Sequence, residues 1–206
     1  FQIHYWQNSV ALFKHTLAVT KESPMAHNSL GVALRILGDY GGAEYHFKEA
    51  LRIRPSFAEA HANLGVMGYE QKKLDLAAVH FREAIRISPL YEDAHFNLGN
   101  VYLMQERYTD AVAEYNIVLG VKPDHAEARN YLGVALICQN YIEGAIREFE
   151  AALRIEPKYA KARINLSNAL EIRNIVAMNS KGKPVNPSDP HETSAPRISG
   201  KKPEQR

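Results

Sequence analysis

Apolar residues recur along this chain with a fixed spacing of 34 residues. Within each period, apolar side chains follow helical spacing in two successive runs, which predicts two helices per period. Five positions carry the register: Leu30, Leu64, Leu98, Leu132; Gly31, Gly65, Gly99, Gly133; Ala43, Ala77, Ala111, Ala145; Phe47, Phe81, Tyr115, Phe149; Pro55, Pro89, Pro123, Pro157. A period of this length is typical of repeat proteins, in which each unit buries its apolar face against its neighbours.

The recurring residue types have physical reasons. A glycine inside a helix costs about 1 kcal/mol relative to alanine, so four in register need a compensating contact. We expect the glycine of the first helix and the alanine of the second to let the two backbones approach closely. The aromatic side chain then fills the gap between neighbouring helix pairs. The proline ends the second helix, because it disfavours helical geometry in the residue before it.

These residues resemble the tetratricopeptide repeat (TPR) family, whose 34-residue unit is helix, turn, helix and proline. The resemblance covers residues 24–159 in four copies. It implies an all-α fold, a right-handed TPR superhelical solenoid of antiparallel helix pairs whose first helices line a concave groove. The position that holds Trp in the family holds His27, His61, His95 and Arg129 here.

We number each period from position 1, and this numbering divides the chain. The predicted segments are a partial N-terminal repeat helix (1–23), TPR 1 (24–57), TPR 2 (58–91), TPR 3 (92–125), TPR 4 (126–159), a C-terminal capping helix (160–175) and a basic tail (176–206). The tail holds five of the ten prolines and few apolar residues, so we expect it to be disordered. Ser23 is an expected N-cap, and Ser56 and Asp124 are expected to open capping boxes.

The charge pattern argues against a nucleic-acid partner. Residues 1–175 hold 19 basic and 20 acidic side chains, whereas residues 176–206 hold 6 basic and 3 acidic ones. A nucleic-acid interface needs a clustered basic face, and the body of the chain has no such excess.

Catalytic and metal chemistry is not expected from this sequence. The histidines at position 4 (His27, His61, His95) should lie one per repeat, too far apart to share one ion, and we interpret them as packing between helices. The single cysteine, Cys138, has no neighbouring catalytic motif, and we expect its thiol to be partly buried. We therefore predict no enzyme activity, no cofactor and no metal site.

What the sequence does offer is a groove. The side chains expected to face it stand at positions 2, 5, 6, 9, 12 and 13 of the first helices. We predict a peptide-binding face formed by Asn63, Tyr69, Phe96, Asn97, Asn100, Asn130, Tyr131 and Asn165. Asparagine amides could bond the backbone of an extended peptide while the aromatic rings supply contact area. The alternative is that these asparagines only join neighbouring helices.

The residues at position 2 restrict the charge that we expect of the ligand. TPR domains that clamp a C-terminal carboxylate carry Lys there, whereas this chain carries Met25, Glu59, Asp93 and Glu127. Acidic side chains repel a carboxylate, so we expect a protein or extended peptide that is neutral or basic.

Residues 5–34 also resemble the junction of polytopic membrane proteins that carry C-terminal TPRs, among them glycosyltransferase-like proteins and transmembrane-and-TPR proteins. That resemblance implies an accessory domain of a membrane glycosyltransferase-like protein, attached through an upstream membrane region with the repeats extracytoplasmic. The alternatives are a free-standing soluble, cytoplasmic TPR adaptor in a multiprotein complex and, third, self-association through the repeat ends. The oligomeric state does not follow from the sequence.

Overall fold

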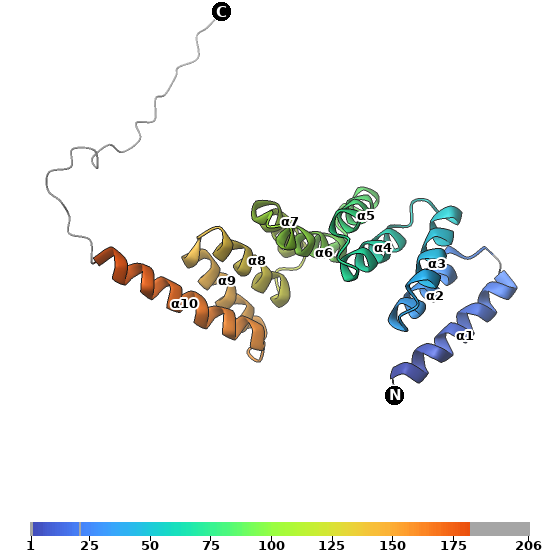
Figure 1. The fold of residues 1–206 in the computed structure, drawn as a ribbon, viewed down its shortest axis with the longest axis horizontal. Coiled ribbons are helices and arrows are strands. Elements are labelled where there is room, and N and C mark those ends of the chain that lie inside the picture. The colour runs from blue at the N-terminus through green and yellow to red at the C-terminus, as the bar shows by residue number, and fades with distance from the viewer. Residues whose placement is uncertain (1, 21, 182–206) are drawn as a thin grey trace, which may run out of the picture.

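The computed structural model describes residues 2–20 and 22–181 (Figure 1). Within these ranges all regular structure is helical. The helices are α1 (Gln2–Thr20), α2 (Pro24–Ile36), α3 (Tyr40–Ile53), α4 (Ala58–Glu70), α5 (Leu74–Ile87), α6 (Glu92–Met104), α7 (Tyr108–Val121), α8 (Ala126–Cys138), α9 (Ile142–Ile155) and α10 (Ala160–Lys181). The predicted all-α solenoid is therefore confirmed. None of these helices is long and apolar enough to cross a membrane.

The helices form two layers with different neighbours. Each first helix packs on its own second helix, as α4 packs on α5, and each second helix also contacts the first helix that follows it. The first helices α2, α4, α6, α8 and α10 touch one another in sequence, whereas in the described part of the chain no two second helices touch. The first helices therefore form the inner layer of a curved array, which Figure 1 shows as a row from α1 to α10.

The glycine at position 8 makes room for a ring rather than for a backbone. A Cβ atom added at Gly65 would lie 2.7 Å from Cε1 of Phe81, and the other three glycines at this position meet their own aromatic ring in the same way. Phe47, Phe81 and Tyr115 are fully buried. The close contact thus lies within each helix pair, whereas the sequence had suggested a ring between pairs.

The turn inside each repeat has a left-handed residue at position 15. Gly38 fills it in the first repeat with φ +85°, but Lys72, Glu106 and Asn140 adopt φ between 59° and 64° in the others. Most non-glycine residues are strained in this region. The turn geometry is therefore kept even where the sequence does not favour it.

The predicted caps are confirmed at one of three places. Ser23 caps α2, because its Oγ accepts from the Ala26 amide at 3.2 Å. The capping boxes led by Ser56 and Asp124 are wrong, since α4 is preceded by Phe57 without a side-chain cap and α8 is capped by His125. The N-cap residue of α4 and of α8 thus lies one residue later than the capping-box pattern predicts.

The last helix is longer than predicted. It continues to Lys181 instead of ending at residue 175, so the first part of the predicted disordered tail is helical. Residues 176–181 include no proline or glycine, and the first helix breaker is Gly182. The rest of the predicted tail, 182–206, lies outside the described residues.

Candidate peptide-binding face

The inner layer of first helices presents the predicted binding residues. Asn63, Tyr69, Phe96, Asn97 and Tyr131 are half-buried. Each therefore keeps part of its side chain at the surface. We call the surface formed by positions 2, 5, 6, 9, 12 and 13 of the first helices the inner face.

Several asparagines of the inner face join neighbouring repeats. Asn63 Nδ2 donates to Asn28 Oδ1 at 2.9 Å, and Asn165 Nδ2 donates to Asn130 Oδ1 at the same distance. Both bonds link position 5 of one repeat to position 6 of the next. Asn130 is only 1% exposed, so the prediction that it contacts a ligand does not fit its place in the structure.

The other two asparagines are also engaged within the repeat. Asn97 Nδ2 donates to the Asp93 carbonyl at 2.8 Å, one turn earlier in α6. Asn100 Oδ1 accepts from the Tyr115 hydroxyl at 2.7 Å. The bonds of Asn63, Asn100 and Asn165 join two helices, as in the alternative interpretation, whereas that of Asn97 stays within α6.

An aromatic cluster replaces the asparagine pair in the middle of the array. Asn28 and Asn63 stand at position 5 of the first repeat and position 6 of the second. The same positions of the third and fourth repeats hold Phe96 and Tyr131, whose rings meet edge to face with their centroids 5.8 Å apart. His125 stacks on Phe96 at 5.2 Å, and Tyr115 stacks on Tyr131 at 6.2 Å. This aromatic cluster of Phe96, Tyr115, His125 and Tyr131 spans α6, α7 and α8.

Tyr115 is predicted from the sequence only as a core residue, although the residue at position 9 of its repeat indicates a polar contact. Three repeats have Phe at position 24 and Val at position 9, whereas this repeat has Tyr115 and Asn100. A buried hydroxyl needs a hydrogen-bond partner, so the two polar residues occur together. Burial raises the pKa of Tyr115 far above its usual range, and the nearby Tyr131 adds to this effect.

Glu127 makes one edge of the cluster acidic. This exposed carboxylate stands at position 2 of α8 and acts on the hydroxyls of Tyr115 and Tyr159. Burial raises the pKa of Tyr159 to about 12, with Glu127 and then Tyr131 contributing further. A carboxylate beside neutral phenols and aromatic faces suits a cationic group of a ligand.

An apolar hollow of about 230 Å³ lies between α8 and α10, and its lining begins at Val134, three residues after Tyr131 in α8. It is lined by Val134, Ile137, Cys138, Phe149, Asn165, Asn168, Ala169 and Ile172. Most of these residues stand at inner-face positions of their helices. Cys138 is exposed here, so the prediction of a partly buried thiol is wrong.

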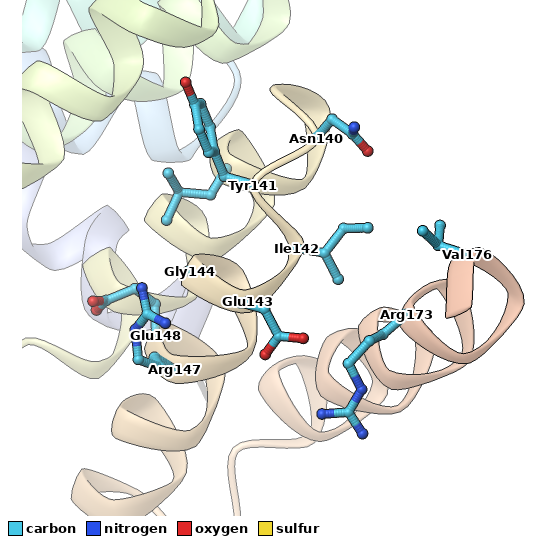
Figure 2. Close-up of a pocket in the computed structure, with 10 residues that line it drawn as sticks. Asn140, Tyr141, Ile142, Glu143, Gly144, Arg147, Glu148, Arg173 and Val176 are labelled. Carbon is cyan, nitrogen blue, oxygen red and sulfur yellow. The ribbon is translucent and has the colours of Figure 1, made fainter. Parts of the chain in front are cut away.

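A larger cavity of about 650 Å³ lies away from the inner face, between the start of α9 and the second half of α10 (Figure 2). Glu143 and Arg173 face it from the two helices. They stand at the positions where Gln105 bonds to Asp75 and Gln139 bonds to Thr109 between earlier repeats. The cavity therefore opens at a joint between repeats and is separate from the candidate binding face.

Position 4 of each first helix pairs with a residue 19 positions later on the second helix. The four pairs are His27–His46, His61–His80, His95–Glu114 and Arg129–Glu148. Position 4 also binds the carbonyl of the proline six residues earlier: His95 Nε2 lies 3.0 Å from the Pro89 carbonyl oxygen, and Arg129 donates to Pro123. Within the described ranges, no group of three or more His, Cys, Asp or Glu residues has metal-site geometry.

Two family profiles match the chain. One, described as TPR repeat, matches residues 33–71 and 67–106, and the other, described as Tetratricopeptide repeat, matches residues 96–160. Together they cover more than half of the sequence. The chain belongs to the tetratricopeptide repeat family. TPR proteins are generally scaffolds for protein interaction and not catalysts.

Solved TPR structures share the fold of this TPR array. The crystal structure of MamA is 24% identical with a TM-score of 0.67, and the match covers 76% of this chain and 91% of that one. Cut9 in the Cut9–Hcn1 hetero-tetramer of the APC/C is 17% identical with a TM-score of 0.74, over 80% of this chain and 33% of that one.

A third solved structure contains a ligand. The first TPR domain of Spaghetti (RPAP3), bound to the HSP90 peptide SRMEEVD, is 19% identical with a TM-score of 0.56, over 57% of this chain and 93% of that one. No curated protein gives a significant sequence match to the chain.

Proposed function

We propose that this TPR array binds an extended peptide along its inner face, centred on the aromatic cluster. The observation that carries the proposal is the replacement of an inter-repeat asparagine pair by Phe96 and Tyr131, which leaves half-buried rings facing the ligand side. Aromatic rings that are held rigidly by stacking offer contact area at low entropic cost. Tyr69 lies on the preceding first helix, α4. Burial raises the pKa of Tyr69, and the nearby Tyr131 raises it further.

The apolar hollow extends this site toward α10. A volume of about 230 Å³ suits one or two aliphatic side chains rather than a folded domain. A peptide that places an aliphatic residue in the hollow would run from the Cys138 side toward Tyr69.

The charge of the inner face favours a neutral or basic peptide. Glu59, Asp93 and Glu127 are all exposed at position 2. The RPAP3 domain binds an acidic HSP90 peptide, whereas carboxylates at position 2 here would repel the same ligand. We therefore infer a partner segment that carries Lys or Arg near an aliphatic residue.

A peptide library tests this proposal. Binding of fluorescent peptides that vary in net charge should select neutral or basic sequences. Glu127→Lys should weaken a selected basic peptide about ten-fold, because it reverses the charge beside the aromatic cluster. Glu150→Lys is the matched control, since Glu150 is equally exposed but lies on a second helix, and it should leave the affinity nearly unchanged.

Aromatic contact is tested in the same assay. Tyr69→Ala should weaken the peptide, whereas Tyr45→Ala should not, because Tyr45 is 59% exposed on α3 in the outer layer. Selection of acidic peptides that depend on a free C-terminal carboxylate would contradict the proposal. Equal losses in the inner-face and outer-layer variants would contradict it too.

The narrower function, an accessory domain of a membrane glycosyltransferase-like protein, rests only on the resemblance of residues 5–34. The alternative is a free-standing adaptor. The mass of the natural product and its partition between membrane and soluble fractions distinguish the two. A product much larger than this chain in the membrane fraction supports the first, and one near 23.2 kDa in the soluble fraction supports the second.

A further inference from the structure

The apolar hollow between α8 and α10 lies where an asparagine takes the place of an aromatic residue. Asn165 lines the hollow at position 6 of α10, where α8 has the larger Tyr131. The hollow has a volume of about 230 Å³, and Ile172 in its lining is 37% exposed. An aliphatic side chain that entered the hollow would remove Ile172 and the exposed Cys138 from water, which is favourable.

The chain itself carries a segment that fits this hollow. Residues 182–206, which lie outside the described part of the structure, contain five basic and three acidic side chains. Among them, residues 196–202 read PRISGKK, with three cations around one isoleucine and no acidic residue. We propose that this segment binds back to the inner face of its own chain, with Ile198 in the hollow, and so competes with the partner peptide. The inference rests on the proposed function, since the competition concerns the same surface.

The length of chain after α10 decides which apolar residue reaches the hollow. Helix α10 ends at Lys181, and Ile172 lies nine residues earlier, about 14 Å back along the helix at about 1.5 Å per residue. Val185 follows Lys181 by four residues, an extended length of about 13 Å, which is too short to return along the helix and enter the hollow. The 17 residues from Lys181 to Ile198 extend to about 56 Å, so Ile198 reaches the hollow easily.

The charges of the segment and of the inner face are complementary. Glu171 is exposed at position 12 of α10 and directly precedes Ile172, just as Arg197 directly precedes Ile198. A guanidinium that meets a carboxylate forms a charge-assisted hydrogen bond, so Arg197 would bind Glu171 while Ile198 fills the hollow. The inner face as a whole has more carboxylates than cations: Glu59, Glu70, Asp93, Glu127 and Glu171 against Arg35 and Lys161.

Modification of Cys138 by iodoacetamide tests whether the segment occupies the hollow. Cys138 is the single cysteine of the chain and lines the hollow, so its reaction rate reports how often the hollow is filled. A tethered segment has an effective concentration on the order of 1 mM, which fills a site with a Kd of about 0.1 mM to about 90%. Ile198→Asp should therefore raise the rate about ten-fold. Val185→Asp is the matched control and should leave the rate unchanged, because Val185 does not reach the hollow.

A charge exchange tests the contact between Arg197 and Glu171. Arg197→Glu should raise the rate of Cys138 modification in the wild-type chain but lower it in a chain that carries Glu171→Lys. Each comparison is made with the same residue at position 171, so the direct effect of that charge on the thiol cancels. A change of the same sign in both chains would contradict the contact.

Unchanged rates in both Ile198→Asp and Arg197→Glu would overturn the proposal. Protection of Cys138 that increases with protein concentration would overturn it too, because the hollow would then hold the segment of a second copy. No partner peptide is present in these measurements, so their failure leaves the proposed function intact. In the peptide assay, Ile198→Asp should raise the affinity of a selected basic peptide about ten-fold. If Cys138 is protected but the library yields no peptide that depends on the inner face, the proposed function fails and the contact of the segment with the hollow stands.

Discussion

Single glycines make room for the aromatic ring of the second helix in each repeat. Alanine has the higher helix propensity by about 1 kcal/mol, so propensity alone predicts that Gly65→Ala would stabilise the chain. The added Cβ, however, would lie 2.7 Å from Cε1 of Phe81, a ring that is fully buried and has no room to move. We expect Gly65→Ala to lower the free energy of unfolding by about 1–3 kcal/mol, measured by urea denaturation.

Gly120 is the control for this substitution. It also lies in a helix, α7, but a Cβ there would meet nothing within 4 Å. Gly120→Ala should therefore raise the free energy of unfolding by about 0.5–1 kcal/mol. If both glycines responded alike, the ring contact would not be the reason for the glycine at position 8.

The Tyr115–Asn100 bond predicts a strong coupling between two residues. Asn100→Val would leave the buried hydroxyl of Tyr115 without its partner, at a cost of about 1–3 kcal/mol. The double variant Tyr115→Phe, Asn100→Val recreates the Phe and Val of the other three repeats and should recover most of that loss. A double-mutant cycle by urea denaturation checks this, and additive single losses would rule out the coupling.

The His27–His46 pair gives a pH dependence with a defined sign. Burial lowers the pKa of both rings from 6.5, and the charge of His27 lowers that of His46 further. Lys14 and Arg52 add to these effects, while Glu49 and Asp39 oppose them. The unfolded chain therefore takes up protons first, so stability is complete above about pH 7 and falls as the pH decreases below 6.5.

Urea denaturation between pH 7.5 and 5 measures that slope. His27→Gln with His46→Gln removes the two rings of this pair and should reduce the slope, of which a part remains because burial also lowers the pKa of His61 and His80. An unchanged difference between pH 7.5 and 5 would show that the pair is not the source. Hydrogen bonds to Lys48 and Arg86 are the main reason why the pKa values of Glu44 and Glu83 are lowered. The contribution of these two carboxylates to the stability of the fold is therefore lost only at lower pH.

The sequence predicted only in part how the residues of the inner face are arranged. Tyr69, Phe96 and Tyr131 lie on the inner face, because the helical period alone places positions 12, 5 and 6 there. Asn63 and Asn165 instead reach across to residues 35 positions earlier, and that pairing depends on how repeats are offset. The pairing at 19 residues, such as His61 with His80, was missed because the histidines were compared only with their equivalents in other repeats.

At the scale of the element, helix spans follow from the apolar period, whereas helix ends do not. First helices begin at 24, 58, 92, 126 and 160, which is a constant spacing. Side-chain caps differ from repeat to repeat, since Ser23, Asp39 and His125 cap their helices and Phe57 does not. The spacing of the first helices is thus constant even where no side chain caps the helix.

The residue at position 15 of each turn has a positive φ angle, and its type should affect the stability of the fold. Glu106 adopts φ 59°, where glycine is favoured, so Glu106→Gly should raise stability by about 0.5–1 kcal/mol. Gly38→Ala makes the opposite change at the equivalent turn, φ +85°, and should lower it by a similar amount. Melting temperatures from circular dichroism check both, and a loss in Glu106→Gly would show that the glutamate side chain contributes more than its backbone strain costs.

At the scale of the whole molecule, every contact between two helices of the described chain includes a first helix. Between repeats, each second helix packs on the first helix that follows it and successive first helices touch, whereas second helices of the described chain do not touch one another. The same first helices that join the repeats therefore also form the continuous inner face. Composition and period predicted this architecture, because each unit buries its apolar side only against its neighbours.

Amide hydrogen exchange with a library-selected peptide tests the central claim, that the inner face binds an extended chain. We expect slower exchange in α4, α6 and α8, strongest around Phe96 and Tyr131, and little change in α3, α5 and α7. A footprint confined to the second helices, or to the cavity between α9 and α10, would contradict it.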